Sequence, residues 1–156
     1  MNLVIADSAV LLRAFVSPPA GASEDILQAF QQSADLLRGV ARGEVQLALS
    51  DAVVAEIIVA LSSPRHFGLS REETASRLRV VLSHPGVRIA ARPAMLAALD
   101  RWAREPGVGF SRALTVQRAV DLGAGLVLEA EGPGSHRRPV ALAEGEDGTP
   151  GDRDAR

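Results

Sequence analysis

Short apolar runs, separated by pairs of helical segments, constrain the fold of this chain more than any other feature. Residues 3–6 (LVIA) form a continuous apolar run, which is typical of a strand buried on both faces. Similar runs follow each pair of helical segments, and strands joined by helical connections pair in parallel. The sequence therefore predicts an α/β fold, a three-layer sandwich with a mainly parallel sheet of four or five strands and helices on both faces. The clear strands are expected at residues 3–6, 45–49, 87–90 and 125–128.

Capping residues mark the ends of the expected helices. Ser50 precedes one helical segment, and Ser70 with Glu73 forms a capping box at the start of another. Pro93 suits the first turn of a third helix, because its fixed backbone angle is already helical. Helices are therefore expected at residues 9–15, 23–41, 51–61, 71–82, 93–104 and 111–122.

The composition changes near residue 132 and divides the chain into two parts. Of the 156 residues, 47% are hydrophobic and 23% are charged, as in one ordinary globular domain. From residue 132 onward, glycine, proline and charged residues dominate. We therefore expect a domain at residues 1–131 and a tail at 132–156 that is disordered apart from a short strand at 139–142.

The residue types that the chain lacks exclude several kinds of chemistry. There is no cysteine, which excludes disulfides, thiolate catalysis and cysteine-ligated zinc. All 17 basic residues are arginine, and the net charge of −2 gives no overall attraction to nucleic acid. The longest apolar run, residues 52–61, is too short to span a bilayer, and the amino end lacks a basic signal region. We therefore expect a cytoplasmic protein with no membrane contact.

Two carboxylates lie where an α/β sheet binds its ligands, beyond the carboxyl ends of the strands. Asp7 follows the first strand, and Glu56 lies in the helix after the second, within the apolar sequence VVAEIIV. A carboxylate among apolar residues costs free energy unless it is paired, protonated or bound to a metal. Glu56 is therefore expected to pair with a cation, for which Arg112 and Arg13 are the candidates. The alternative is an exposed residue on an amphipathic helix.

Basic residues and histidines outside these positions give weaker signals. A modest RNA-facing patch is one interpretation of the arginines between residues 77 and 104, and an ordinary solvated surface is the other. His66 and His84 lie in expected turns, where surface or capping roles are favoured over metal binding. The arginines in question are Arg77, Arg79, Arg88, Arg92, Arg101 and Arg104.

Three stretches of the sequence follow the motifs of a known family, in order and with similar spacing. The first is DSAVLLR at residues 7–13, and the second is SDAVVAE at 50–56, followed by FGLSREE at 67–73. The third is GFSRAL at 109–114, continued by LGA at 122–124. Over residues 1–131 the chain resembles the PIN domains, and in particular the ribonuclease toxins of bacterial toxin–antitoxin pairs.

The resemblance implies a metal-dependent endoribonuclease. The family gathers three or four carboxylates that hold one or two Mg²⁺ or Mn²⁺ ions, and hard cations of this kind prefer oxygen ligands. The bound ion activates water for attack on phosphorus. By this resemblance the first acid corresponds to Asp7 and the second to Glu56.

The sequence departs from the family at the other two acidic positions. The third acid falls on Arg112 and the fourth on Ala130, which leaves Glu131 as a displaced substitute if the strand bends. At roughly 5 Å and an effective dielectric constant near 20, a guanidinium repels a divalent cation by about 6 kcal/mol. A guanidinium can instead pair with Asp7 or Glu56 and take the cation's position. We therefore expect a degraded metal site.

Three functional hypotheses follow from this pattern. The favoured one is a PIN relative with impaired or lost catalysis that still binds RNA or a protein partner. One alternative is an active Mg²⁺- or Mn²⁺-dependent endoribonuclease that uses Asp7, Glu56 and Glu131. The other is a structural module whose role is self-association.

The resemblance also implies a homodimer and a small antitoxin-like protein as partners. Helices at residues 23–41 and 71–82 carry more apolar side chains than one side of a small sheet needs to cover it, so we expect them to contribute to the dimer contact. These side chains are Ile26, Phe30, Leu37, Val80, Val81 and Leu82.

Overall fold

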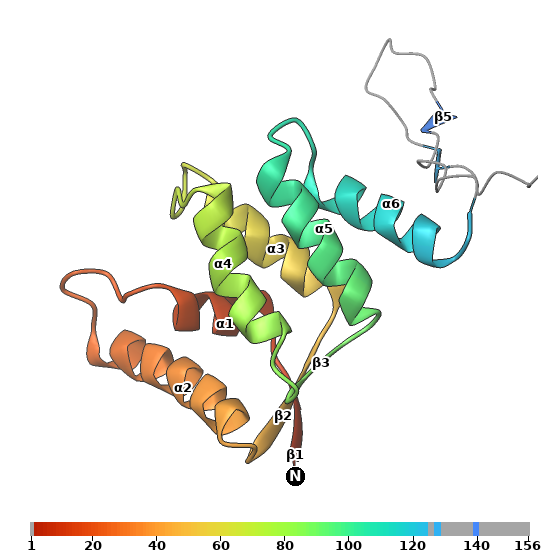
Figure 1. Ribbon diagram of the computed structural model, residues 1–156. Coiled ribbons are helices and arrows are strands. Elements are labelled where there is room, and N and C mark those ends of the chain that lie inside the picture. The colour runs from red at the N-terminus through yellow and green to blue at the C-terminus, as the bar shows by residue number, and fades with distance from the viewer. Residues whose placement is uncertain (1, 125–126, 129–138, 141–156) are drawn as a thin grey trace, which may run out of the picture.

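A computed structural model describes residues 2–124, 127–128 and 139–140, with side chains described over residues 2–124 (Figure 1). Three strands form a parallel sheet in the order β1-β2-β3. Val4 lies beside Leu47, and Leu47 lies beside Val87, so β2 is the central strand. The strands are β1 (Asn2–Ile5), β2 (Val45–Leu49) and β3 (Val87–Ile89).

In the part of the chain that the structure describes, six helices surround the carboxyl-terminal end of this sheet (Figure 1). Three of them begin at a side chain that accepts a hydrogen bond from the first turn: Asp7 caps α1, Ser50 caps α3 and Ser70 caps α4. The helices are α1 (Ser8–Phe15), α2 (Glu24–Ala41), α3 (Asp51–Ser62), α4 (Arg71–Leu82), α5 (Arg92–Arg104) and α6 (Phe110–Asp121).

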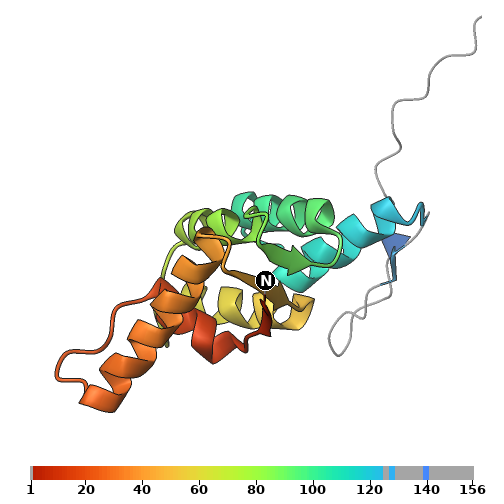
Figure 2. The same ribbon diagram turned by 90° about the horizontal axis from the view of Figure 1, so that it is seen from below.

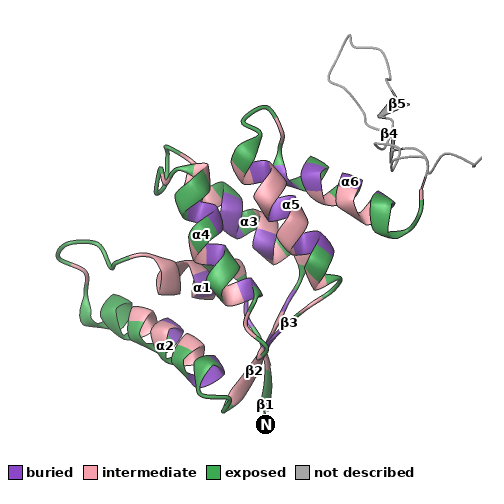
Figure 3. Cartoon of the chain, in the orientation of Figure 1, coloured by how far each residue is buried: buried purple, intermediate pink, exposed green. Residues whose placement is uncertain are grey.

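The core lies where α3, α4 and α5 meet the strands. Leu47 and Val87 are fully buried in the sheet, and Ile57, Leu78 and Leu99 are fully buried on the three helices. Figure 3 shows the buried residues on the facing sides of these helices, whereas α2 is mostly exposed or half-buried. Seen from below, α2 extends away from the other helices (Figure 2). The helices of the core are therefore fixed by packing on several sides, and α2 by packing on α1 and β2.

The α/β class predicted from the sequence is confirmed, and the size of the sheet is corrected. The described sheet has three strands instead of four or five. The expected last strand appears as β4 (Val127–Leu128), which pairs antiparallel with β5 (Pro139–Val140) as a separate two-stranded unit. An apolar run identifies a strand but does not identify its neighbour, which explains the difference. The rest of the expected tail, residues 132–138 and 141–156, lies outside the described residues.

Candidate functional site

Asp7 lies two residues beyond the end of β1, where the resemblance places the first acid. Its Oδ1 accepts a hydrogen bond of 2.9 Å from the backbone N–H of Val10, so the carboxylate is the N-cap of α1. The side chain is exposed. One carboxylate oxygen therefore caps the helix, which is an ordinary structural role for an aspartate at the N-cap position.

Glu56 is exposed on α3, so the expectation of a buried, paired carboxylate is wrong. Val54, Ile57 and Ile58 face the core, and Glu56 lies on the opposite face with Val59, which is 64% exposed. Among the described residues Glu56 forms no ion pair, with Arg13 or with any other side chain. The exposed alternative is the one that the structure adopts.

Arg112 is the third residue of α6 and is exposed. Since α6 packs against α3, the element that carries Arg112 is a neighbour of the element that carries Glu56. The other positions of the implied site, Glu131 and Ala130, lie outside the described residues. The structure thus places Asp7 just before α1, Glu56 on α3 and Arg112 on α6, and α3 packs against both α1 and α6.

The described residues do not fit a divalent metal ion. Within residues 2–124, no three side chains of histidine, aspartate or glutamate gather closely enough to hold one. Asp7 already uses an oxygen as a helix cap, and the third position holds a guanidinium in place of a carboxylate. Mg²⁺ requires several oxygen ligands in near-octahedral geometry, so this donor set is a poor match.

A shallow hollow adjoins Glu56 on the outer face of α3. It has a volume of about 310 Å³ and is lined by Ala55, Glu56, Val59, Ala60 and His66. Its lining is almost entirely apolar, and His66 is exposed, in agreement with a surface role. A carboxylate and an imidazole alone supply too few ligands for a structural metal site.

Most arginines of the suggested RNA-facing patch are bound to other parts of the protein. Arg77 donates to Glu73 and to the carbonyl oxygen of Phe15, and Arg101 donates to Glu105. Arg92 donates to the carbonyl oxygen of Val87, and Arg79 pairs with Asp100. These contacts support the interpretation of an ordinary structural surface.

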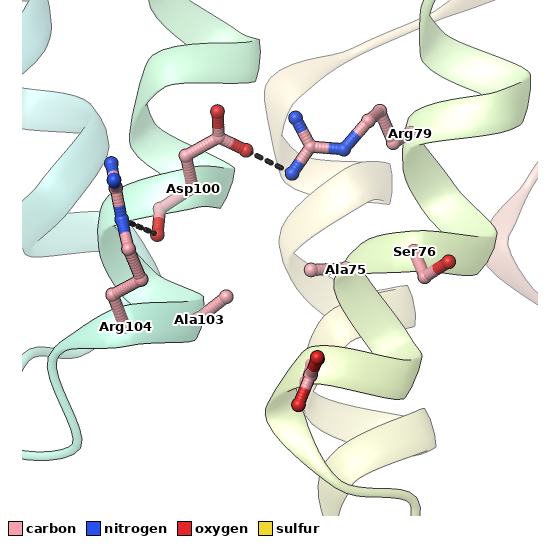
Figure 4. Close-up of a pocket in the computed structure, with 7 residues that line it drawn as sticks. Ala75, Ser76, Arg79, Asp100, Ala103 and Arg104 are labelled. Atoms are coloured by element: carbon pink, nitrogen blue, oxygen red, sulfur yellow. Dashed lines mark hydrogen bonds and ion pairs between the residues drawn. The ribbon is translucent and has the colours of Figure 1, made fainter.

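A hollow of about 630 Å³ lies between α4 and α5. Figure 4 shows Arg79 reaching from α4 to Asp100 on α5, and Arg104 bonded back to the backbone of Asp100. The hydrogen bond that Arg79 donates to the carboxylate of Asp100 raises the pKa of Arg79 above its ordinary value. Two arginines and two acids balance in charge, so the hollow attracts no anion by net charge. It is lined by Glu72, Ala75, Ser76, Arg79, Asp100, Ala103 and Arg104.

Arg71 holds the turn between α5 and α6 and was not recognised from the sequence. Its Nη1 donates to the carbonyl oxygens of Trp102, Glu105 and Val108, at 2.7, 2.8 and 2.9 Å. The guanidinium also lies 5.0 Å from the centre of the Trp102 ring, a cation–π contact. Its partners are 31 to 37 residues away, so no local pattern indicates them.

The apolar side chains expected at a dimer contact divide into core and surface. Leu82 is fully buried and therefore belongs to the core, whereas Val80 is 73% exposed and Ile26 is 42% exposed. Phe30, Leu37 and Val81 are half-buried. A cavity of about 170 Å³ opens between the carboxyl-terminal ends of α2 and α4, lined by Leu37, Val40, Ala41, Val80, Val81, His84 and Val87.

His84, at the edge of this cavity, is half-buried and has a structural role in the turn that follows α4. Its Nδ1 accepts a hydrogen bond of 3.1 Å from the N–H of Gly86, which closes the turn before β3. The cavity is therefore an almost wholly apolar feature with one ring nitrogen engaged in the turn.

Comparison with known proteins adds no family assignment. No family model matches the chain, and neither the curated proteins nor the solved structures give a match. The class of the protein comes from the structure alone, which shows an α/β fold with a three-stranded parallel sheet in the described residues. In the part of the chain that the structure describes, no helix is both long and apolar enough to cross a membrane.

Proposed function

We propose that this chain is a cytoplasmic PIN-like protein in which metal-dependent ribonuclease activity is impaired or lost and partner binding is retained. The proposal rests on the sequence resemblance at Asp7, Glu56 and Arg112. The single observation that carries it is the guanidinium of Arg112, in the first turn of a helix that packs against the Glu56 helix. A cation held in that position opposes the binding of Mg²⁺ or Mn²⁺.

Between RNA and a protein as the retained partner, the surface favours a protein. The arginines that an RNA backbone would need are largely engaged with carboxylates and carbonyl oxygens. Exposed Val80 and Ile26, in contrast, lie on helices that border an apolar cavity. Apolar surface of this kind fits the side chains of an antitoxin-like partner.

Titration calorimetry with Mn²⁺ tests the loss of the metal site. We expect weak or no binding by the unaltered chain, and measurable binding by Arg112→Asp, because the substitution replaces the opposing charge with a ligand. Arg88→Asp is the matched control, since Arg88 is also exposed and lies on β3 instead. Tight binding by the unaltered chain, abolished by Asp7→Asn, would contradict the proposal and indicate an active nuclease site.

A further inference from the structure

Arg13, in the last turn of α1, is a half-buried cation without a partner in the part of the chain that the structure describes. Within residues 2–124, the side chains of only two other arginines, Arg65 and Arg88, make no hydrogen bond or ion pair, and both are exposed. A partly buried guanidinium loses some of its water and costs free energy unless an anion or another acceptor replaces that water. The surroundings of Arg13 therefore favour an anion that the described residues do not supply.

The structural needs of α1 do not account for Arg13. The helix dipole favours a cation in the last turn, but this leaves the N–H donors of the guanidinium unused. The carbonyl oxygen of Phe15, at the end of α1, accepts a hydrogen bond of 2.7 Å from Arg77. Glu56, the partner that the sequence suggested, is exposed on α3 and forms no ion pair with Arg13.

Arg13 lines a hollow of about 400 Å³ between the end of α1 and the neighbouring α2 (Figure 1). This volume lies within the range of small-molecule sites in proteins. The lining contains one cation, Arg13, and no acidic residue. The rest of the lining is largely apolar, with one hydroxyl and one amide. The side chains most relevant to binding are Val16, Leu27, Phe30, Ser17 and Gln31.

The acids near this hollow on α2 do not neutralise Arg13. Asp35 lies one turn beyond Gln31, pairs with Arg38 at 2.6 Å and accepts a hydrogen bond of 3.3 Å from Gln31. The two acids in the first turn of α2 are exposed and do not line the hollow. Arg13 therefore gives the lining a net positive charge, whereas the charges around the hollow between α4 and α5 balance.

We propose that the hollow between α1 and α2 binds a small carboxylate with an apolar body. The carboxylate pairs with the guanidinium of Arg13, whose planar fork matches two carboxylate oxygens. The apolar body lies against Leu27, which is 46% exposed, and Phe30, which is half-buried. A single cation balances the one charge of a carboxylate, whereas a phosphate monoester carries about two, so a carboxylate is the favoured anion. This site does not depend on the function proposed above.

An amide NMR titration of the full chain with 4-phenylbutyrate tests the site. We expect saturable shifts at residues 13–17 and 27–34, with a dissociation constant on the order of 1 mM, because one ion pair and a small apolar contact give modest affinity. Two matched compounds separate the contributions. The compound 4-phenylbutanamide keeps the apolar body without the charge, and acetate keeps the charge without the body. Each should bind at least about 10-fold more weakly.

Two substitutions and a control assign the binding to this hollow. Arg13→Gln removes the charge and should weaken the binding of 4-phenylbutyrate by about 10-fold. Ala34→Leu keeps Arg13 but fills part of the hollow, so it should weaken binding by a similar factor. Arg88→Gln removes an exposed, unpaired arginine on β3 and should leave the dissociation constant unchanged. All three positions are half-buried or exposed, so amide spectra outside the hollow should match those of the unaltered chain.

Three results would overturn the proposal. The first is the absence of saturable shifts at residues 13–17 and 27–34 up to about 20 mM 4-phenylbutyrate, well above the expected dissociation constant. The second is unchanged affinity in Arg13→Gln or in Ala34→Leu. The third is equal affinity for the amide, which would exclude a role of the charge, or for acetate, which would exclude a role of the apolar body. No divalent ion is present in this titration, so its failure is distinguishable from the failure of the proposed function.

Discussion

Arg71 on α4 donates to three carbonyl oxygens, whereas Glu56 on the neighbouring α3 extends into solvent without an ion pair among the described residues. The first residue joins α4 to the turn between α5 and α6, and the second joins nothing that the structure describes. The charged side chains of this protein are therefore of two kinds. One kind maintains the fold, and substituting it should cost stability. The other kind is available for binding, and substituting it should change ligands without changing stability.

The largest loss of stability is expected from Arg71→Ala. The substitution removes three hydrogen bonds from a cationic donor and leaves their carbonyl oxygens without that partner, and it removes the contact with Trp102. We expect about 3 kcal/mol less free energy of unfolding in urea. Arg88→Ala, at an exposed arginine on β3, is the control and should change it by less than about 0.5 kcal/mol. Equal effects of the two variants on the free energy of unfolding would show that the contacts of Arg71 contribute no stability.

A smaller loss is expected from Arg118→Ala. Arg118 pairs with Asp51 at 2.9 Å and so joins the last turn of α6 to the first turn of α3. Asp51 Oδ1 is buried and has no hydrogen-bond partner among the described residues, so removing the guanidinium leaves the carboxylate poorly satisfied. We expect a loss of about 1–2 kcal/mol. A double-mutant cycle with Asp51→Ala measures the coupling, and a coupling of zero would mean that the pair does not join the helices.

At Asp7 the charge and the helix cap can be tested separately, because one substitution removes both and another removes only the charge. Asp7→Ala removes the cap on Val10 and should lower the free energy of unfolding by about 1 kcal/mol. Asp7→Asn retains an oxygen that accepts the same hydrogen bond while removing the charge, so its stability should match the unaltered chain. If both variants lost stability equally, the charge and not the cap would be what Asp7 contributes.

The smallest effect is expected at Glu56. Because its side chain is exposed and unpaired among the described residues, Glu56→Gln should change the free energy of unfolding by less than about 0.5 kcal/mol. A buried, paired carboxylate would instead cost about 3–5 kcal/mol on breaking the pair. Urea unfolding distinguishes these values, and a loss of that size would restore the buried carboxylate that the sequence suggested.

Local signals in the sequence predict the helices well, because their ends are fixed by nearby residues. The helix expected at residues 71–82 has those bounds in the structure, where Ser70 accepts from the N–H of Glu73. The helix expected at 23–41 begins one residue later, after Ser23 as its N-cap. The partner of a strand is predicted less well, because pairing depends on residues far apart in the chain.

The candidate site was predicted less well than the helices, for two physical reasons. α3 is apolar on almost every face, so its sequence does not show which face meets the core, and Glu56 was assigned to the wrong one. Arg71 was missed because its carbonyl partners come from a distant turn. Asp7 was found because a polar residue after an apolar run is a local signal, although the expectation that this strand is buried on both faces is wrong, since Leu3 is 53% and Ile5 is 81% exposed.

Incubation of the full chain with a labelled single-stranded RNA and Mn²⁺ tests the proposed loss of catalysis most directly. Asp7→Asn is the matched control, since it removes the charge and leaves an acceptor for the helix cap. We predict that the unaltered chain leaves the RNA as intact as the variant does. Mn²⁺-dependent cleavage by the unaltered chain that disappears in Asp7→Asn would contradict the proposal and identify a working nuclease.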